Sequence, residues 1–550
     1  MASAPYHSPP PDLSWSVNGI VDLTVHVDSS TKFQSDSQAS NVRVPRWRTP
    51  EFALYAVIFV IVVPYMAMSA VELSQHPKAT HPNYPSYQHR LSRGWLFGRA
   101  VDNSDTQYRS FRDNIPGLCF LSSLYLGSGY LYTRIAIPGN TPTTSLEYRT
   151  QFISVFSCIM LCALHGTSAL KIFAILYVNY HIAKQTRGVP VGVLLTWIFN
   201  ISIIFANELF DGYHYAALHP ALGPLDRIRG LYPRWHVGFN ITMLRLVSFN
   251  LDHYWASSQT GDSLNERLRR STAHPLGVYN FTNYLAYAIY PPLYIAGPIM
   301  TFNDFMWQLR RPHSMSAYAR ASYAARFFFS FIVMEFVLHY IYVVAIKDTK
   351  AWNGDTAFQL AMIGYWNLLI LWLKMDPPEN MVRCISNAYS TLGFWRSWHR
   401  SYNLWLIRYI YVPVGGSTST ILPKLVVFTF VALWHDLSMR LLIWGWLISL
   451  FILPEVIATA VLPESKYGEK PWYRHVCAAG GVMNLLMMMT ANLVGFVLGT
   501  EGMVYLAGKL FGTWEGMRFL SIALPSLFVA IQVMFEYREA EKRRGIVRRC

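Results

Sequence analysis

Long apolar runs, interrupted by short polar connections, occupy most of this chain. A helix needs roughly 20 mostly apolar residues to cross a membrane. Twelve segments reach or approach that length, at residues 52–70, 117–133, 152–182, 189–206, 236–250, 281–300, 327–346, 357–373, 422–434, 441–461, 476–498 and 519–535. The shortest cannot cross about 30 Å of hydrocarbon unaided, which indicates tilted, re-entrant or half-depth helices. The pattern predicts an all-α polytopic membrane protein of about 11–13 transmembrane or re-entrant helices.

Polar stretches divide the chain into three parts. We expect a polar N-terminal tail or arm at 1–50, a membrane domain at 51–536 with a polar insert at 74–116, and a C-terminal tail at 537–550. The first stretch has no basic region followed by an apolar one, so no cleavable signal peptide is expected. The C-terminal tail carries six Lys or Arg against two Glu, which places it in the cytosol.

Composition supports a lipid-embedded protein. Hydrophobic residues make up 53% of the chain and charged residues only 14%, whereas soluble domains are about a quarter charged. The net charge of +15 indicates basic cytosolic loops and affinity for anionic lipid headgroups rather than nucleic-acid binding. The six cysteines are scattered without a Cys-x-x-Cys pair, so we expect neither a metal site nor a disulfide framework.

The first unusual stretch, here the Pro-Pro segment, runs through residues 290–298 and is followed by Asn303 and Asp304. Its two prolines and its Gly-Pro pair break the helical hydrogen-bond ladder inside an apolar segment. In a membrane such a break is tolerated where neighbouring protein or a cavity satisfies the freed backbone groups. The segment is therefore either a kinked helix end or a cavity wall.

The second stretch, the aromatic-basic segment at 394–416, interleaves aromatic and basic residues. Arg396, Arg400 and Arg408 are four and eight apart, so on one helix they would share a face. The basic face suits phosphates and the aromatic face suits a membrane interface, so we expect the segment to lie along the membrane surface. It should end at Pro413 and the following glycine pair. A plain interfacial anchor is the alternative.

The third stretch places a histidine far inside an apolar run. Ten uncharged residues separate Lys424 from His435. At about 1.5 Å per residue, His435 would lie about half a bilayer deep. An ionisable side chain at that depth indicates a pathway or an active site. The alternative is a histidine satisfied by an interhelical hydrogen bond. Glu335 and His339, four apart in another apolar run, are interpreted as structural.

These residues carry a resemblance. The second and third stretches resemble the signature of the membrane-bound O-acyltransferase family, and the Pro-Pro segment is similar to that family's upstream segment. His399 and His435 are 36 apart, which, with the run Asn-Glu-Leu-Phe-Asp-Gly-Tyr-His-Tyr at 207–215, resembles the fungal glycerol-uptake-protein subfamily of glycosylphosphatidylinositol (GPI) anchor-remodelling enzymes. The segment at 403–416 resembles the hedgehog-acyltransferase branch. The resemblance covers residues 50–540 and implies a bundle with a central tunnel, in the endoplasmic reticulum membrane.

The resemblance implies an enzyme that moves a long-chain acyl group from acyl-CoA, as co-substrate, to a lipid hydroxyl. The acceptor would be a lyso-GPI lipid or a GPI-anchored protein. His435 would be the general base, because burial keeps its imidazole neutral. His399 would hold or polarise the thioester. The remaining candidates for substrate binding are Trp398, Asn403, Arg396, Arg400, Arg408, Trp434, Asp436 and Tyr411.

Several alternatives stay open at this point. Cys384 lies in a segment that resembles one whose cysteine ligates a haem iron in the hedgehog branch, although a buried cysteine is the simpler interpretation. A proton-coupled polyol transporter would also place ionisable groups at mid-membrane, but no paired repeat of broken helices is found. Within the family, lysophospholipid acylation and protein N-palmitoylation are the other activities. Oligomeric state is not predicted.

Overall fold

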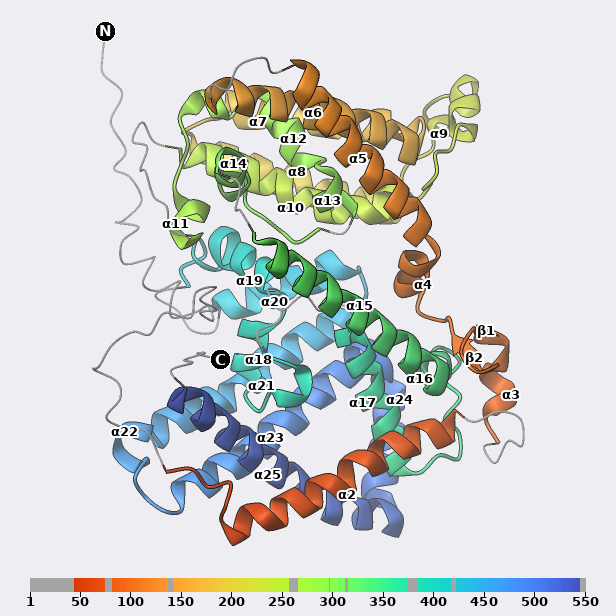
Figure 1. Ribbon diagram of the computed structural model, residues 1–550, viewed down its shortest axis with the longest axis vertical. Coiled ribbons are helices and arrows are strands. Elements are labelled where there is room, and N and C mark those ends of the chain that lie inside the picture. The colour runs from red at the N-terminus through yellow and green to blue at the C-terminus, as the bar shows by residue number, and fades with distance from the viewer. Residues whose placement is uncertain are drawn as a thin grey trace. The chain divides into compact units, whose positions relative to one another are not determined.

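The computed structural model describes residues 44–74, 82–136, 142–256, 266–295, 297–311, 315–373, 383–416 and 422–544. Residues 1–43 of the predicted N-terminal tail (1–50) and the chain end at 545–550 lie outside these residues. The described chain is almost entirely helical and forms two compact units, one from residues 1–113 with 317–550 and the other from 114–316 (Figure 1). The predicted all-α polytopic membrane fold is confirmed.

The six described helices that are long and apolar enough to cross a membrane are α2 (Pro50–Leu73), α8 (Pro190–Leu209), α15 (Ala317–Tyr340), α21 (Met439–Val461), α23 (Tyr473–Asn492) with its π-helical extension η7 (Leu493–Val497), and α25 (Trp514–Arg543). Each overlaps a run predicted from the sequence. The helix α25 continues through Arg543, so the first part of the predicted C-terminal tail is helical.

The unit at 114–316 contains α8 and four further long helices. These are α5 (Ile115–Ala136), α6 (Pro142–His165), α7 (Ser168–Gln185), α8 and α10 (Trp235–Tyr254), with the shorter elements α9 (Tyr215–Leu218), η3 (Pro220–Arg227), α11 (Glu266–Ser271), η4 (Leu276–Val278), α12 (Phe281–Ala288), α13 (Pro291–Ile295) and α14 (Phe302–Arg310). The run at 152–182 is two helices, because the chain turns at Gly166 with φ +57°. A Cβ there would lie 2.3 Å from the carbonyl oxygen of Ile228.

The predicted helix over 281–300, which contains the Pro-Pro segment, lies in this unit and is not one helix. It is divided into α12 and α13, and non-helical residues follow. Arg245 of α10 satisfies the freed backbone, because its Nε donates to the carbonyl of Ala288 at 2.8 Å and its Nη1 to that of Leu293 at 2.6 Å. Arg245 is 1% exposed. The break is therefore supported by neighbouring protein, as a membrane setting requires.

The unit formed by 1–113 and 317–550 contains the rest. Besides α2, α15, α21, α23, η7 and α25, it holds α3 (Tyr84–Tyr87), η2 (Gln88–Arg90), β1 (Leu91–Arg93), β2 (Ala100–Asp102), α4 (Thr106–Asp113), α16 (Val343–Asp348), α17 (Ala357–Leu373), η5 (Ile385–Asn387), α18 (Thr391–Ser397), α19 (Arg400–Leu406), η6 (Ile407–Tyr411), α20 (Leu422–His435), α22 (Glu464–Tyr467) and α24 (Gly499–Gly512). Helix α21 packs against α20 and α23, and α25 packs against α23, α24 and α2.

The polar insert folds onto α15 of the same unit. Its strands β1 and β2 form an antiparallel hairpin, with Ser92 opposite Val101. The carboxylate of Glu335, 1% exposed, accepts hydrogen bonds from the indole of Trp95 at 3.0 Å and the hydroxyl of Tyr108 at 2.9 Å. Arg112 adds an ion pair at 3.5 Å. These contacts give Glu335 a structural role and explain a carboxylate within an apolar helix.

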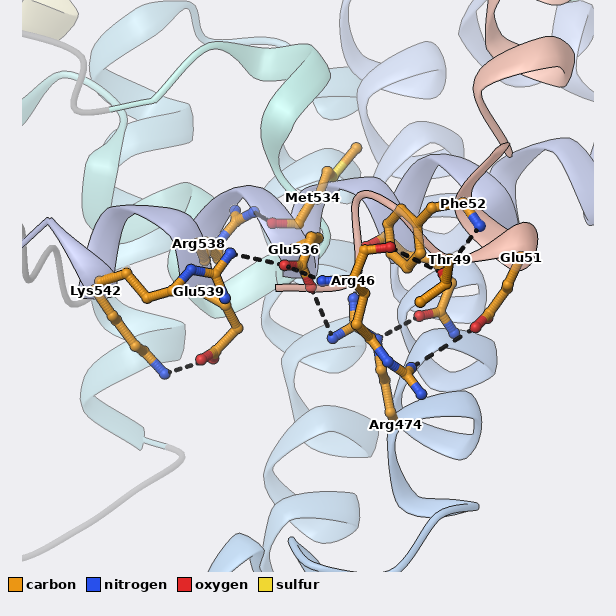
Figure 2. Close-up of polar contacts among 12 residues, drawn as sticks. Arg46, Thr49, Glu51, Phe52, Arg474, Met534, Glu536, Arg538, Glu539 and Lys542 are labelled. Carbon is orange, nitrogen blue, oxygen red and sulfur yellow. Dashed lines mark hydrogen bonds and ion pairs between the residues drawn. The ribbon is translucent and has the colours of Figure 1, made fainter. Parts of the chain in front are cut away.

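A second buried carboxylate ties the N-terminal end of α2 to the end of α25. Glu536 is 1% exposed and lies 3.6 Å from Nη1 of Arg474 and 2.7 Å from Nη2 of Arg543. It also accepts the backbone N–H of Arg46 at 3.1 Å. Figure 2 shows Arg46 and Arg474 converging on Glu536, while Glu539 of the same helix pairs with Lys542.

We predict that Glu536→Gln destabilises the protein, because it leaves buried guanidinium groups without this carboxylate. Breaking a buried ion pair from one side costs about 3–5 kcal/mol. Glu539→Gln is the matched control on the same helix, and its partly exposed pair with Lys542 should contribute no more than about 1 kcal/mol. The thermal unfolding midpoints of the two variants in detergent measure the difference, and equal midpoints would contradict a structural role for Glu536.

Candidate active site

A sharp break in the chain places His399. The periodicity of the aromatic-basic segment predicted one continuous helix. The structure instead divides the segment into α18, α19 and the π-helix η6. His399 lies at the break with φ +44°, a left-handed conformation that costs non-glycine residues energy and often occurs at functional sites. The amide of Asn403 donates to the carbonyl of Arg396 at 3.1 Å and holds the end of α18.

The break also separates the three arginines. Arg396 lies in the last turn of α18, Arg400 begins α19 and Arg408 lies in η6. The expectation of one basic helical face was therefore wrong, because the left-handed residue at 399 changes the direction of the chain between the first arginine and the second. The predicted end of the segment agrees with the structure. The π-helix η6 ends at Tyr411, and a Cβ on Gly416 would lie 2.2 Å from the ring of Tyr411.

The antiparallel pair α20 and α21 places His435, the last residue of α20. The two helices approach closely at Gly445, where a Cβ would lie 2.8 Å from the carbonyl oxygen of Phe428. The ring of Trp434 lies against that of Tyr402 with centroids 4.8 Å apart, which connects the end of α20 to α19. The two short helices that carry the histidine stretches are thus packed together next to His435.

Both histidines line one cavity of about 340 Å³. Its walls are mostly aromatic and aliphatic side chains from α17, α18, α19, α20 and α21. His435 is exposed, and it lines this cavity. The two imidazoles also lie within electrostatic range of each other. His435 is therefore accessible to a substrate and is not closed off by packing.

The charged residues among the described lining are all basic. They are Arg396 and Lys424, and no Asp or Glu lines this cavity in the described part of the chain. Lys424 and His435 are eleven residues apart on α20, which corresponds to about 16 Å along a helix. The cavity thus has cationic side chains near one end of α20 and an imidazole at the other. Sequence reasoning missed Lys424, since a lysine at the start of an apolar helix usually anchors the helix at the interface.

The opposite wall of the cavity is built from α21 and the end of α23. The indole N–H of Trp444 donates to Oδ1 of Asn492 at 3.1 Å, and both residues line the cavity. A Cβ on Gly495 would lie 2.8 Å from the indole ring of Trp444. Gly495 lies in the π-helix η7, and π-helical turns occur frequently at functional sites. No sequence motif indicated these residues, because they approach the histidines only through the packing of α21 and α23.

The structure brings most of the predicted site residues together. The cavity lining includes His435 and His399 together with Trp398, Asn403, Arg396 and Tyr411. Arg400, Arg408, Trp434 and Asp436 are not among its lining residues. Trp434 instead packs behind His435, Arg408 lies over the ring of Tyr409 at 5.4 Å, and Asp436 is exposed.

Cys384 is the residue for which the resemblance implied an axial haem ligand. Its sulfur lies 3.0 Å from Oγ of Ser386, and Cys384 does not line the histidine cavity. The haem ligand stays a prediction from the resemblance, and no step below involves a haem. Among the described residues, no group of three or more His, Cys, Asp or Glu is placed to hold a metal ion.

Comparison with known proteins agrees with this arrangement. The model of the membrane-bound O-acyltransferase family matches residues 193–500, more than half of the chain. The chain is 44% identical to membrane-bound O-acyltransferase GUP1 of Saccharomyces cerevisiae, over 95% of this chain and 97% of that protein. It is 43% identical to the protein of the same name in Candida tropicalis, over 96% and 94%.

A more distant relative is the protein-cysteine N-palmitoyltransferase HHAT of mouse, 28% identical over 29% of this chain and 37% of that protein. The family match spans both histidines, α20, α21 and the Pro-Pro segment. The resemblance drawn from the sequence is therefore confirmed. The family is one of multi-pass membrane acyltransferases, which argues against the transporter alternative. This chain belongs to the membrane-bound O-acyltransferase family.

Proposed function

We propose that the protein transfers a long-chain fatty acyl group from acyl-CoA to a hydroxyl of a lyso-GPI lipid in the endoplasmic reticulum membrane, with the C-terminus in the cytosol. The observation that carries the proposal is one apolar cavity that contains two histidines and, among its described lining, only basic charged residues. Apolar walls suit a fatty chain, an imidazole suits removal of a hydroxyl proton, and cations suit phosphates.

The separation of Lys424 and His435 along α20 supports CoA as the donor. Thirteen covalent bonds separate the thioester sulfur of CoA from its nearest phosphorus, and an extended chain of that length spans about 16 Å at about 1.2 Å per bond. Lys424 and His435 are separated by about the same distance along α20. With the pyrophosphate at Lys424 and Arg396, the thioester would therefore reach His435.

The proposed reaction needs a base and a means of holding the thioester. A ring nitrogen of His435 takes the proton of the acceptor hydroxyl while its oxygen attacks the thioester carbonyl carbon. His399 holds the donor through a hydrogen bond to the acyl carbonyl or to the CoA moiety. The carbon–sulfur bond then breaks, and the CoA thiolate takes the proton from His435. Asn403 acts by keeping α18 and His399 in place, since its amide is bound to the carbonyl of Arg396.

The choice of acceptor rests on the resemblance to the fungal glycerol-uptake-protein subfamily and on the extent of identity to its members. A lyso-GPI lipid carries a free glycerol hydroxyl, a fatty chain and a phosphate. These features suit a base, an apolar wall and a cavity whose described lining contains no acidic residue. A protein amine as acceptor is favoured less, because the relative named for N-palmitoylation aligns with only 29% of this chain.

We predict that His435→Ala abolishes acyl transfer while the protein still folds and inserts. Loss of a general base slows a reaction by about 100-fold to 10,000-fold. In a strain lacking this protein, mass spectrometry of GPI anchors should show lyso or unremodelled lipid, which wild-type protein corrects and His435→Ala does not. The exposed His89→Ala is the control and should restore the lipid. Normal remodelled anchors in the His435→Ala strain would remove His435 from the role of base.

For His399→Ala we expect a mixed effect, with a lower kcat and a higher KM for acyl-CoA, because this residue is assigned to holding the donor. Initial rates at varied acyl-CoA and at varied acceptor separate the two parameters. The KM for the acceptor should stay close to that of the wild-type protein. Unchanged kinetics with both substrates would exclude His399 from the site.

The double variant Arg396→Met with Lys424→Met tests the phosphate site. We expect KM for acyl-CoA to rise about 10-fold to 100-fold, since hydrogen bonds to charged groups contribute about 1.5–3 kcal/mol. An acyl-pantetheine thioester, which lacks the phosphates, should be used equally by variant and wild type. The exposed Arg440→Met is the control. An equal loss with both donors would contradict phosphate binding and indicate a general defect of the cavity.

A further inference from the structure

Tyr402 is a buried tyrosine of α19 whose hydroxyl has no hydrogen-bond partner. Its side chain is 6% exposed, and its hydroxyl oxygen is inaccessible and unpaired among the described residues. Several other buried tyrosines among the described residues are paired, although the half-buried Tyr213 also has a hydroxyl without a partner there. The hydroxyl of Tyr87 donates to the carbonyl of Leu73 at 2.7 Å, and that of Tyr284 to the carbonyl of Leu176 at 3.0 Å. Tyr402 therefore differs from tyrosines that serve only to fill the core.

The position of Tyr402 connects it to the reacting groups. It lies three residues after His399 and lines the same cavity as both histidines. Its ring packs against Trp434, the residue before His435, with centroids 4.8 Å apart. A second unpaired donor, the indole of Trp395, also belongs to the lining, and its ring packs against Phe428, Trp444 and Trp398, the residue before His399. Of the two donors, Tyr402 is the one whose ring packs against the residue before His435, the proposed base.

An unpaired buried hydroxyl is unfavourable, because the group has lost its hydrogen bonds to water without replacement. A phenylalanine would pack equally well against Trp434 without that cost. A hydroxyl is useful at this position only if a partner arrives with the substrate. A substrate bound in the cavity that Tyr402 lines would supply such a partner.

We propose that Tyr402 is a catalytic residue whose hydroxyl donates a hydrogen bond to the acyl carbonyl oxygen as that oxygen becomes negative. This inference rests on the proposed acyl transfer from a thioester. The acceptor oxygen bonds to the carbonyl carbon, its proton passes to His435, and the carbonyl electron pair moves to the oxygen bound by Tyr402. When this electron pair re-forms the carbonyl, the carbon–sulfur bond breaks and the CoA thiolate takes the proton from His435. Donors placed at a developing oxyanion stabilise the transition state more than the ground state.

The test compares Tyr402→Phe with wild type at saturating acceptor and varied acyl-CoA, with released CoA thiol as the readout. We expect kcat to fall about 100-fold, the loss measured when one oxyanion donor is removed elsewhere, with KM for acyl-CoA within about twofold. The thermal unfolding midpoint should stay the same or rise, because a buried unpaired group has been removed. Tyr87→Phe is the matched control, for which the midpoint should fall and kcat stay unchanged.

Two outcomes would overturn the inference. One is a wild-type kcat in Tyr402→Phe, and the other is a loss of activity that follows a lowered unfolding midpoint. Replacement of Tyr402 by 3-fluorotyrosine, a slightly larger and stronger donor, keeps the test decisive if the phenylalanine variant does not fold, since its kcat should equal or exceed that of wild type. A kcat as low as that expected for Tyr402→Phe would contradict the role.

The same assay separates this inference from the proposed function. If wild-type protein releases CoA with a lysophospholipid but not with a lyso-GPI lipid, the proposed acceptor is wrong while the role of Tyr402 is still measured. If wild-type protein releases no CoA with any lipid or protein acceptor, thioester transfer itself fails, and the oxyanion role of Tyr402 fails with it.

Discussion

Two imidazoles can share an apolar cavity only if the chain leaves its helical path beside them and the exposed backbone is satisfied. At His399 the backbone takes a left-handed conformation between α18 and α19, and the amide of Asn403 holds the carbonyl of Arg396 across the break. At His435 the helix ends, and the close approach of Gly445 to Phe428 fixes α21 against α20. The arrangement of the other site residues depends on these two chain breaks.

The electrostatic character of the cavity follows from what surrounds the histidines. Arg396 and Lys424 contribute positive charge, and the described lining contains no carboxylate. Neutral imidazoles and fixed cations make such a cavity suited to an anionic, fatty ligand. Tyr402, whose hydroxyl is unpaired among the described residues, packs against Trp434, the residue before His435.

The rest of the protein shows the same physical requirement away from the cavity. Arg245 satisfies the carbonyls freed by the Pro-Pro segment, Glu335 is surrounded by donors from the hairpin insert, and Glu536 neutralises buried arginines where α2 meets α25. Burial of polar groups is costly unless they are paired. These pairs explain why ionisable residues within apolar helices can be structural, whereas His435, which borders open space, is a candidate for chemistry.

The lengths of the apolar runs determined the approximate places of the long helices, because a 20-residue apolar run has few alternatives in a membrane. They did not determine the number of helices, since the runs at 152–182 and 281–300 are each divided. The spacing of His399 and His435 with its flanking motif determined the family. Only the tertiary structure decided which basic residues line the cavity: Lys424 and, of the three arginines, Arg396 alone. It also decided that Trp444, Asn492 and Tyr402 belong to the lining. A local sequence pattern assumes a continuous helix, whereas a single left-handed residue and the packing of distant helices determine which side chains meet.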